Sequence, residues 1–143
     1  MMRPTAYYLF ASYAALLVCV HFASVSAITP ELDKRAKAAV AKCADVPRTD
    51  EAKKEDCHAG CFMSAMGYMT NGEINVKNME EANKQKWDDQ EIIKKGIQVD
   101  TTCAKQVGDT KGKSECTIGY EFSTCKKELV KKVGLPPPTP LKE

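Results

Sequence analysis

Seven cysteines in 143 residues constrain the fold of this chain more than any other feature of its sequence. Six cysteines can form three disulfide bonds and leave no free thiol, whereas seven cannot. Cys19 lies in an apolar stretch near the N-terminus, apart from the others. A small domain with an even set of cysteines is typical of disulfide-linked proteins in oxidising compartments. The six candidates for pairing are Cys43, Cys57, Cys61, Cys103, Cys116 and Cys125.

Residues 1–27 have the layout of a secretory signal peptide. Arg3 gives a positive start, residues 6–20 form an uncharged apolar run, and the small residues Val-Ser-Ala end at Ala27. A membrane-spanning helix needs about 20 apolar residues, and this run is shorter. We therefore expect cleavage after Ala27 and an extracellular protein. Cleavage removes Cys19, which leaves the even set of six.

Composition limits the classes of protein to which the chain can belong. A net charge of +2 does not favour nucleic-acid binding, which needs a basic field around the phosphates. A mean hydropathy of −0.38 argues against several membrane spans. The length fits one domain. We expect residues 28–135 to form it and residues 136–143 to be an extended, mobile tail, because successive prolines cannot continue a helix.

Capping residues and apolar periodicity predict helices almost throughout, and no strand with convincing alternation. The apolar face expected for the first helix contains Leu32, Ala36, Val40 and Cys43. The expected helices, with their capping or ending residues, run from Thr29 to before Pro47, from Asp50 to about Met69, from Val76 to Lys86 (the weakest), from Asp88 or Asp89 to about Val107, and from Ser114 to Val133.

Helical spacing limits which cysteines can pair, but it leaves several pairings open. Cys57 and Cys61 are four residues apart and share one face of a helix. Cys116 and Cys125 are nine residues apart, so at about 100° per residue they point in opposite directions and must reach different partners. Six cysteines allow about 15 connectivities, and this geometry excludes some without selecting one.

The gaps between the six cysteines carry a family resemblance. From Cys43 the pattern is C-x13-C-x3-C-x41-C-x12-C-x8-C. Residues 57–73 (CHAGCFMSAMGYMTNGE) and residues 114–125 (SECTIGYEFSTC) add local similarity. The spacing resembles that of the insect odorant-binding proteins, in the pheromone-binding and general odorant-binding group. The first segment is similar to the family's third helix and the turn after it, and the second segment is similar to its last helix. The resemblance covers most of the chain after the leader.

This resemblance implies an all-α fold: a compact, disulfide-linked bundle of about five to six helices around an apolar cavity. It also implies a secreted, non-catalytic carrier of small apolar or amphipathic ligands such as odorants or pheromones. A membrane receptor would be a further partner, and the assembly would be a monomer or a weak homodimer. The disulfide pairs that it implies are Cys43–Cys61, Cys57–Cys116 and Cys103–Cys125.

The chain departs from the family between its first two cysteines. The family usually has a longer segment there than the 13 residues from Ala44 to Asp56. We therefore expect the helix that covers part of the family's cavity to be missing. The alternative function is a secreted protein-interaction scaffold of the same fold without a small-molecule pocket.

The residues expected to bind a ligand are apolar side chains on three predicted helices. The methionine-rich run after Cys61 is equally compatible with plain core, but flexible methionines also suit cavities that accept several ligand shapes. The hydroxyl of Tyr68 could hydrogen-bond a ligand oxygen. The expected ligand-binding set is Met63, Met66, Tyr68, Met69, Ile93, Ile97, Val107, Ile118, Phe122 and Leu129.

Enzymatic and metal-binding functions are not favoured. Cys57, His58 and Cys61 could superficially bind zinc, but six cysteines with a single histidine after the leader favour disulfides. The chain has no G-x-S-x-G motif and no adjacent cysteine pair beside a histidine, as a helical lipase would need. His58 is more typical of a polar surface residue than of a pH switch. We expect no cofactor and no metal.

Asp100 is the polar residue that the helical pattern explains least well. It falls near the middle of an apolar stripe, where an unpaired carboxylate would be costly. Either the helix breaks and Asp100 caps a new turn, which we favour, or Asp100 faces an amine ligand or a buried partner. We expect Trp87 to anchor a loop, and the pairs Lys126-Lys127 and Lys131-Lys132 to lie on a solvated helix face.

Overall fold

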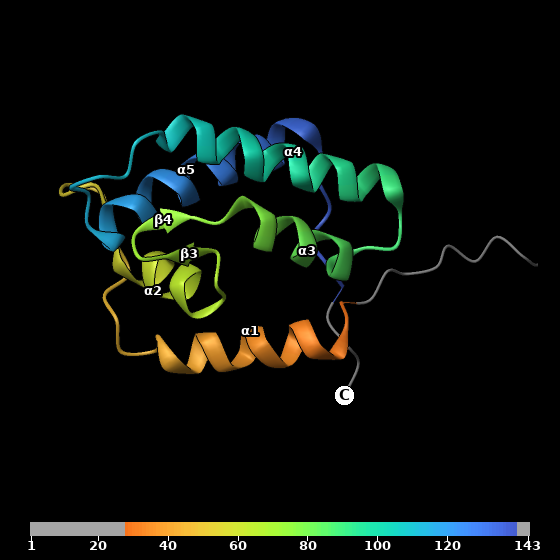
Figure 1. The fold of residues 1–143 in the computed structure, drawn as a ribbon, viewed down its shortest axis with the longest axis horizontal. Helices are drawn as coiled ribbons and strands as arrows, with labels where there is room; N and C mark the ends of the chain where they lie inside the picture. The colour runs from red at the N-terminus through yellow and green to blue at the C-terminus, as the bar shows by residue number, and fades with distance from the viewer. Residues whose placement is uncertain (1–27, 140–143) are drawn as a thin grey trace, which may run out of the picture.

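The computed structural model describes residues 28–139, and this part of the chain is mainly helical (Figure 1). Two short antiparallel hairpins, in which β1 pairs with β2 and β3 with β4, interrupt the helices. The expectation of an all-α fold is confirmed for these residues, whereas the expected signal peptide lies outside them. The elements are α1 (Pro30–Lys42), β1 (Thr49–Asp50), β2 (Glu55–Asp56), α2 (Cys57–Ala65), β3 (Met69–Thr70), β4 (Glu73–Ile74), α3 (Val76–Lys86), α4 (Gln90–Val107) and α5 (Glu115–Val133).

Three helices begin at the capping residues that the sequence predicts. The Thr29 hydroxyl accepts a hydrogen bond from the Leu32 amide at the start of α1. The Ser114 hydroxyl does the same at the start of α5. For α4 the sequence left two candidates, and the structure has Asp89, whose carboxylate accepts from two backbone amides at 2.8 and 3.0 Å. These side chains satisfy donors that a helix start leaves without partners.

The helix expected from Asp50 to Met69 is wrong at both ends. The Asp50 carboxylate instead caps a tight turn, and Lys54 takes a positive φ of 54°, so the chain reverses from β1 into β2. Asp56 is the actual cap of α2. At the far end, Gly67 has a φ of 71° and Met69 lies in β3. A hairpin therefore occupies much of the short segment between the first two cysteines.

The choice between two neighbouring aspartates gives a first prediction. Replacing Asp89 by alanine removes the cap of α4, and we expect the free energy of unfolding to fall by about 1 kcal/mol. Replacing exposed Asp88 by alanine is the matched control and should change it by less than about 0.5 kcal/mol. Denaturant unfolding of both variants measures the difference. Equal losses would show that Asp89 acts through its charge alone.

Three disulfides tie the helices together. Cys43, which follows α1, pairs with Cys61 of α2; Cys57 of α2 pairs with Cys116 of α5; and Cys103 of α4 pairs with Cys125 of α5. These are the same three pairs that the family resemblance implies. They link the helices in the order α1, α2, α5 and α4, so α2 and α5 each carry two of the bonds.

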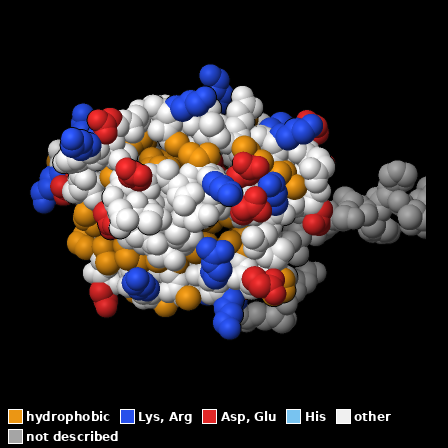
Figure 2. Space-filling model, in the orientation of Figure 1, with side chains coloured by type: hydrophobic (Ala, Val, Ile, Leu, Met, Phe, Trp, Pro, Cys, Tyr) orange, Lys and Arg blue, Asp and Glu red, His pale blue; other side chains and the backbone are white. Residues whose placement is uncertain are grey.

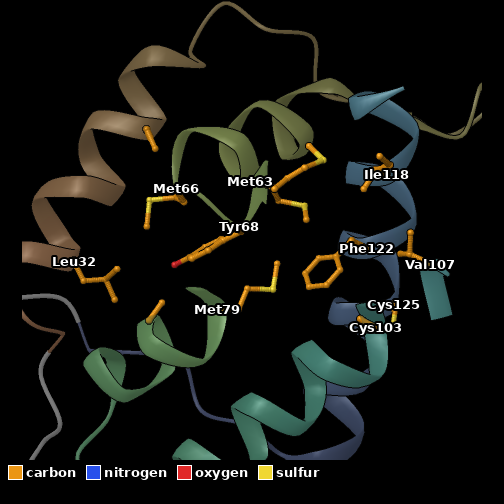
Figure 3. Packing of buried hydrophobic residues seen from close by; sticks show 13 residues of the cluster. Leu32, Met63, Met66, Tyr68, Met79, Cys103, Val107, Ile118, Phe122 and Cys125 are labelled. Atoms are coloured by element: carbon orange, nitrogen blue, oxygen red, sulfur yellow. A yellow bond between two sulfur atoms is a disulfide. The ribbon is translucent and has the colours of Figure 1, made fainter. Parts of the chain in front are cut away.

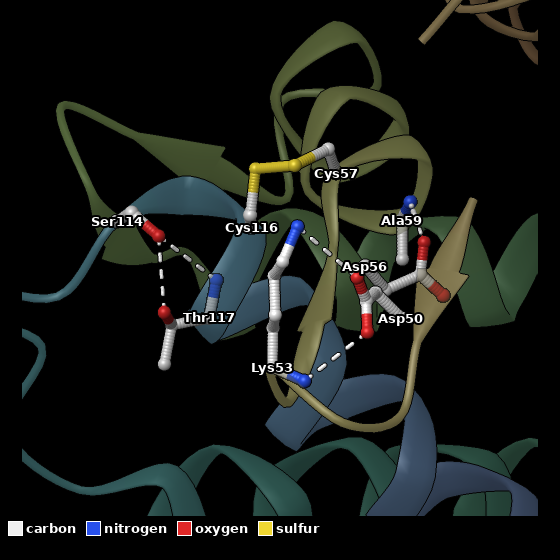
Figure 4. The surroundings of a disulfide bond; sticks show 8 residues. All are labelled: Asp50, Lys53, Asp56, Cys57, Ala59, Ser114, Cys116 and Thr117. Atoms are coloured by element: carbon white, nitrogen blue, oxygen red, sulfur yellow. Dashed lines mark hydrogen bonds and ion pairs between the residues drawn. A yellow bond between two sulfur atoms is a disulfide. The ribbon is translucent and has the colours of Figure 1, made fainter. Parts of the chain in front are cut away.

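Two glycines allow α2 and α5 to cross at close range, next to the Cys57–Cys116 disulfide (Figure 4). A methyl group on Gly119 would overlap the backbone nitrogen of Gly60 and would lie 2.6 Å from the carbonyl oxygen of Asp56. A methyl group on Gly60 would likewise overlap the backbone of α5. Only residues without a Cβ therefore fit at this crossing, which fixes α2 against α5.

The apolar core divides into a large cluster between the helices and a small one near the C-terminal end. The buried face of α1 contains Leu32, Ala39 and Cys43, with Ala36 packed beside them. Val40 was wrongly expected on this face, and it is 48% exposed. The small cluster contains Trp87, Ile93 and Leu135. Trp87 is buried in this cluster.

Candidate ligand-binding pocket

An apolar pocket of about 360 Å³ lies where α1, α2 and α5 approach one another. This volume is within the range of roughly 300–1,000 Å³ that is usual for small-molecule sites. A patch of hydrophobic side chains lies toward the end of this face where α2 is found, and charged side chains are scattered around it (Figure 2). The apolar lining comes from Ile28, Leu32, Ala36, Ala59, Phe62, Met63, Met66, Tyr68, Phe122 and Pro138.

The pocket lining converges from elements that are far apart in the sequence. Leu32 on α1 and Met66 and Tyr68 after α2 extend toward a common space, and Phe122 faces them from α5 (Figure 3). Burial raises the pKa of Tyr68 to about 12, so its hydroxyl remains protonated at neutral pH. A protonated hydroxyl can donate a hydrogen bond to a ligand oxygen.

Four of the ten residues expected to bind a ligand line this pocket: Met63, Met66, Tyr68 and Phe122. The other six lie elsewhere among the described residues. Met69, Val107 and Ile118 are buried in the closed part of the large core, and Leu129 packs against it. Ile93 and Ile97 belong to the small cluster at the other end of α4. Helical periodicity placed most of these residues on faces that pack against the core, but it could not separate a closed core from a pocket wall.

Lining residues on α1, at the end of α3 and in the C-terminal segment were not predicted from the sequence. Leu32 and Ala36 were expected on the apolar face of the first helix, and this periodicity was the sequence feature that could have indicated their place in the pocket wall. Lys86 and Lys126 also line the pocket, and their charge concealed this role. Pro138, which also lines the pocket, lies in the segment expected to be an extended, mobile tail.

The C-terminal segment lies against the helical domain as far as residue 139. Leu135 is buried in the small cluster. The backbone amide of Ile28 donates a hydrogen bond of 3.1 Å to the carbonyl of Thr139. Both ends of the described chain therefore meet beside the pocket, and prolines suit this segment because it is extended and not helical.

Asp100 does not break α4, contrary to the favoured expectation; it faces a buried partner, as the alternative supposed. It is only 1% exposed. Its two carboxylate oxygens accept from the Lys126 ammonium at 2.6 Å and from the Asn83 amide at 2.8 Å. Lys126 was expected on a solvated face, and this ion pair is the reason that it is not. Lys127 and the pair Lys131-Lys132 are exposed, as expected.

Lys86 continues the hydrogen-bond network of Lys126, Asp100 and Asn83, and it lines the pocket. Its ammonium donates to Asn83 Oδ1 at 3.3 Å and lies 5.9 and 5.7 Å from the ring centres of Tyr68 and Trp87. Burial lowers the pKa of Lys86 to about 8, and the nearby charge of Lys126 adds to the effect, whereas Asp100 partly opposes it. The pocket therefore combines an apolar wall with two ammonium groups at one end.

Other kinds of site find little support within residues 28–139. No group of three or more histidine, cysteine or acidic side chains in this range could hold a metal ion. The helices described there are too short or too polar to cross a membrane. His58 Nδ1 lies 3.5 Å from the Arg48 guanidinium, and its buried Nε2 has no hydrogen-bond partner among the described residues.

Comparisons of the chain with family models, with curated proteins and with solved structures found no match. The fold, the disulfide framework and the chemistry of this pocket are therefore the features that indicate its function.

Proposed function

We propose that this protein is a secreted, non-catalytic carrier that binds small apolar or amphipathic molecules in the pocket between α1, α2 and α5. The carrier resembles insect odorant-binding proteins, and odorant-like or pheromone-like molecules are its proposed ligands. The observation that carries the proposal is the apolar pocket itself, which has a suitable volume and a wall rich in methionine and aromatic side chains. A membrane receptor is a further proposed partner.

The chemistry of such a carrier is desolvation. Burying apolar surface contributes about 25 cal/mol per Å² before the costs of binding are subtracted. The unbranched, flexible side chains of Met63 and Met66 can adjust to ligands of different shape. Tyr68 adds one hydrogen-bonding group in otherwise apolar surroundings. The disulfides limit the cost of ordering, because they hold the helices in place before a ligand arrives.

Fluorescence titration of the oxidised protein with an environment-sensitive apolar dye tests the proposal. We expect saturable binding of one dye per protein, with a Kd in the micromolar range or tighter, and displacement by long-chain alcohols or esters. Folded protein with three intact disulfides and no saturable binding would contradict the carrier function. That result would favour the alternative, a protein-interaction scaffold of the same fold.

Two alanines on α1 provide a prediction with a matched control. Ala36 lines the pocket, so phenylalanine at this position should fill part of it and weaken dye binding by about tenfold or more. Ala38 is exposed on the same helix, and Ala38→Phe should leave dye binding unchanged. The same titration measures both variants. Equal weakening by the two changes would show that the dye does not bind in this pocket.

A further inference from the structure

We propose that the pocket selects amphiphiles with a carboxylate head group, of the medium-chain fatty-acid class, and holds the head group at Lys86 and Lys126. The apolar chain of the ligand would lie along the wall formed by Leu32, Met63 and Met66. This inference rests on the proposed carrier function and names its ligand class. It follows from the charge balance and the position of the two lysines.

The polar cluster of Lys86, Lys126, Asn83 and Asp100 carries two half-buried ammonium groups and one buried carboxylate. The carboxylate of Asp100 on α4 forms an ion pair with Lys126 of α5, at 2.6 Å, and accepts a second hydrogen bond from Asn83. Among residues 28–139, the ammonium of Lys86 contacts the amide oxygen of Asn83, at 3.3 Å, and the faces of two aromatic rings, but no carboxylate at ion-pair distance. The cluster thus has an excess charge of one cation, and a ligand anion would balance it.

The charged and titratable groups around Lys86 also leave an excess of positive charge beside the pocket. Lys126 faces it from α5 and Asp100 from α4, and Tyr68 packs against it from the segment after α2. On the side of α1, the Arg35 guanidinium donates to the carbonyl of Met66 at 2.9 Å, and its charge offsets only part of the rise that burial causes in the pKa of Tyr68. Most of these neighbours are cationic or neutral, and the single carboxylate is already paired.

The two lysines stand at the boundary between apolar spaces. Both line the pocket of about 360 Å³ and also a neighbouring one of about 220 Å³, whose walls include Trp87 and Leu135. A head group bound there would be within reach of both ammonium groups, while the chain would extend into the larger space. Charge-assisted hydrogen bonds to a carboxylate are about twice as strong as neutral ones. An alcohol of the same length would bury the same chain without this gain.

The proposal predicts a pH dependence that a neutral ligand would not share. Burial lowers the pKa of Lys86 to about 8, and a bound carboxylate would raise it again by supplying a counter-charge. Carboxylate affinity should therefore be nearly constant around neutral pH, where the ligand is ionised and Lys86 is protonated, and should fall above about pH 8 as the free protein loses this proton. Between pH 7 and pH 9 the expected fall is about tenfold.

The experiment compares displacement of the bound dye by decanoate and by decanol, at pH 7 and pH 9. We expect wild-type protein to prefer decanoate at pH 7 and to lose most of that preference at pH 9. Lys86→Met should reduce the affinity for decanoate about tenfold or more relative to the affinity for decanol. Lys127→Met removes an exposed charge from α5 as the matched control and should change neither.

The possible outcomes separate this inference from the carrier function. Binding of decanol without a preference for decanoate would overturn the inference and leave the carrier intact. The same holds if Lys86→Met keeps the wild-type preference, or if the preference is equal at the two pH values. The pH comparison uses wild-type protein, so it decides the question even if Lys86→Met does not fold. Absence of dye binding would instead contradict the proposed function.

Discussion

Replacing Gly119 by alanine is expected to lower the free energy of unfolding by about 3 kcal/mol or more. Within a helix, this exchange normally adds stability, by up to about 1 kcal/mol. Here the added methyl group would meet backbone atoms of Gly60 and Asp56, which cannot move away without separating α2 from α5. Denaturant unfolding of the oxidised protein measures the change.

Gly96 provides a graded comparison within the same fold. A methyl group there would lie 2.8 Å from a ring carbon of Trp87 and 3.1 Å from the side chain of Asn83. These neighbours are side chains, which can shift by small rotations, so Gly96→Ala should cost less than Gly119→Ala. A stabilising effect of Gly119→Ala, as in an isolated helix, would contradict the close crossing.

Replacing Lys126 by methionine is expected to cost about 3 kcal/mol of unfolding free energy. The change removes the cation 2.6 Å from Asp100 and leaves that fully buried carboxylate with a single amide donor from Asn83. Breaking one side of a buried ion pair is costly because the remaining charge has lost its compensation. Thermal or denaturant unfolding at neutral pH measures the loss.

A second substitution tests whether the uncompensated charge is the cause. Asp100→Asn in the Lys126→Met background removes the remaining charge and should restore more than half of the lost stability. Lys127→Met is the control, because Lys127 is exposed on the same helix; its effect should stay within about 0.5 kcal/mol. No recovery in the double variant would mean that Lys126 acts through packing and not through Asp100.

Local signals along the chain predicted most of the helical framework. Thr29, Asp89 and Ser114 are short polar residues ahead of periodic apolar runs, and each caps a helix. The helix expected from Asp50 failed because Asp50 also suits a turn, and only the positive φ of Lys54 distinguishes the two outcomes. Capping residues thus indicate a chain reversal or a helix start equally well, and tertiary packing decides between them.

The pocket was predictable only in part, because its wall is assembled from segments far apart in the chain. Met63 and Met66 line the pocket, whereas Met69 of the same apolar run lies in the closed core. Lys86 could not be assigned to the wall from sequence, because its burial depends on aromatic rings and on α5. Asp100 was misjudged for the same reason: its partners come from α3 and α5.

The close crossing of α2 and α5 connects the fold to the proposed function. Met63 lies on α2 and Phe122 on α5, and both line the pocket. The contact at Gly60 and Gly119, together with the Cys57–Cys116 disulfide, fixes the distance between these two walls. A variant that folds with the crossing loosened should therefore also bind ligands more weakly.

Nuclear magnetic resonance of methionine methyl groups, labelled with carbon-13, tests the central claim most directly. Met63 and Met66 line the pocket, whereas Met69 and Met79 are buried outside its lining. On titration with decanol we expect saturable shifts and the strongest nuclear Overhauser effects to the ligand chain at Met63 and Met66. Saturable binding with its strongest contacts at Met69 and Met79, or no saturable change at any of the four, would contradict a carrier that uses this pocket.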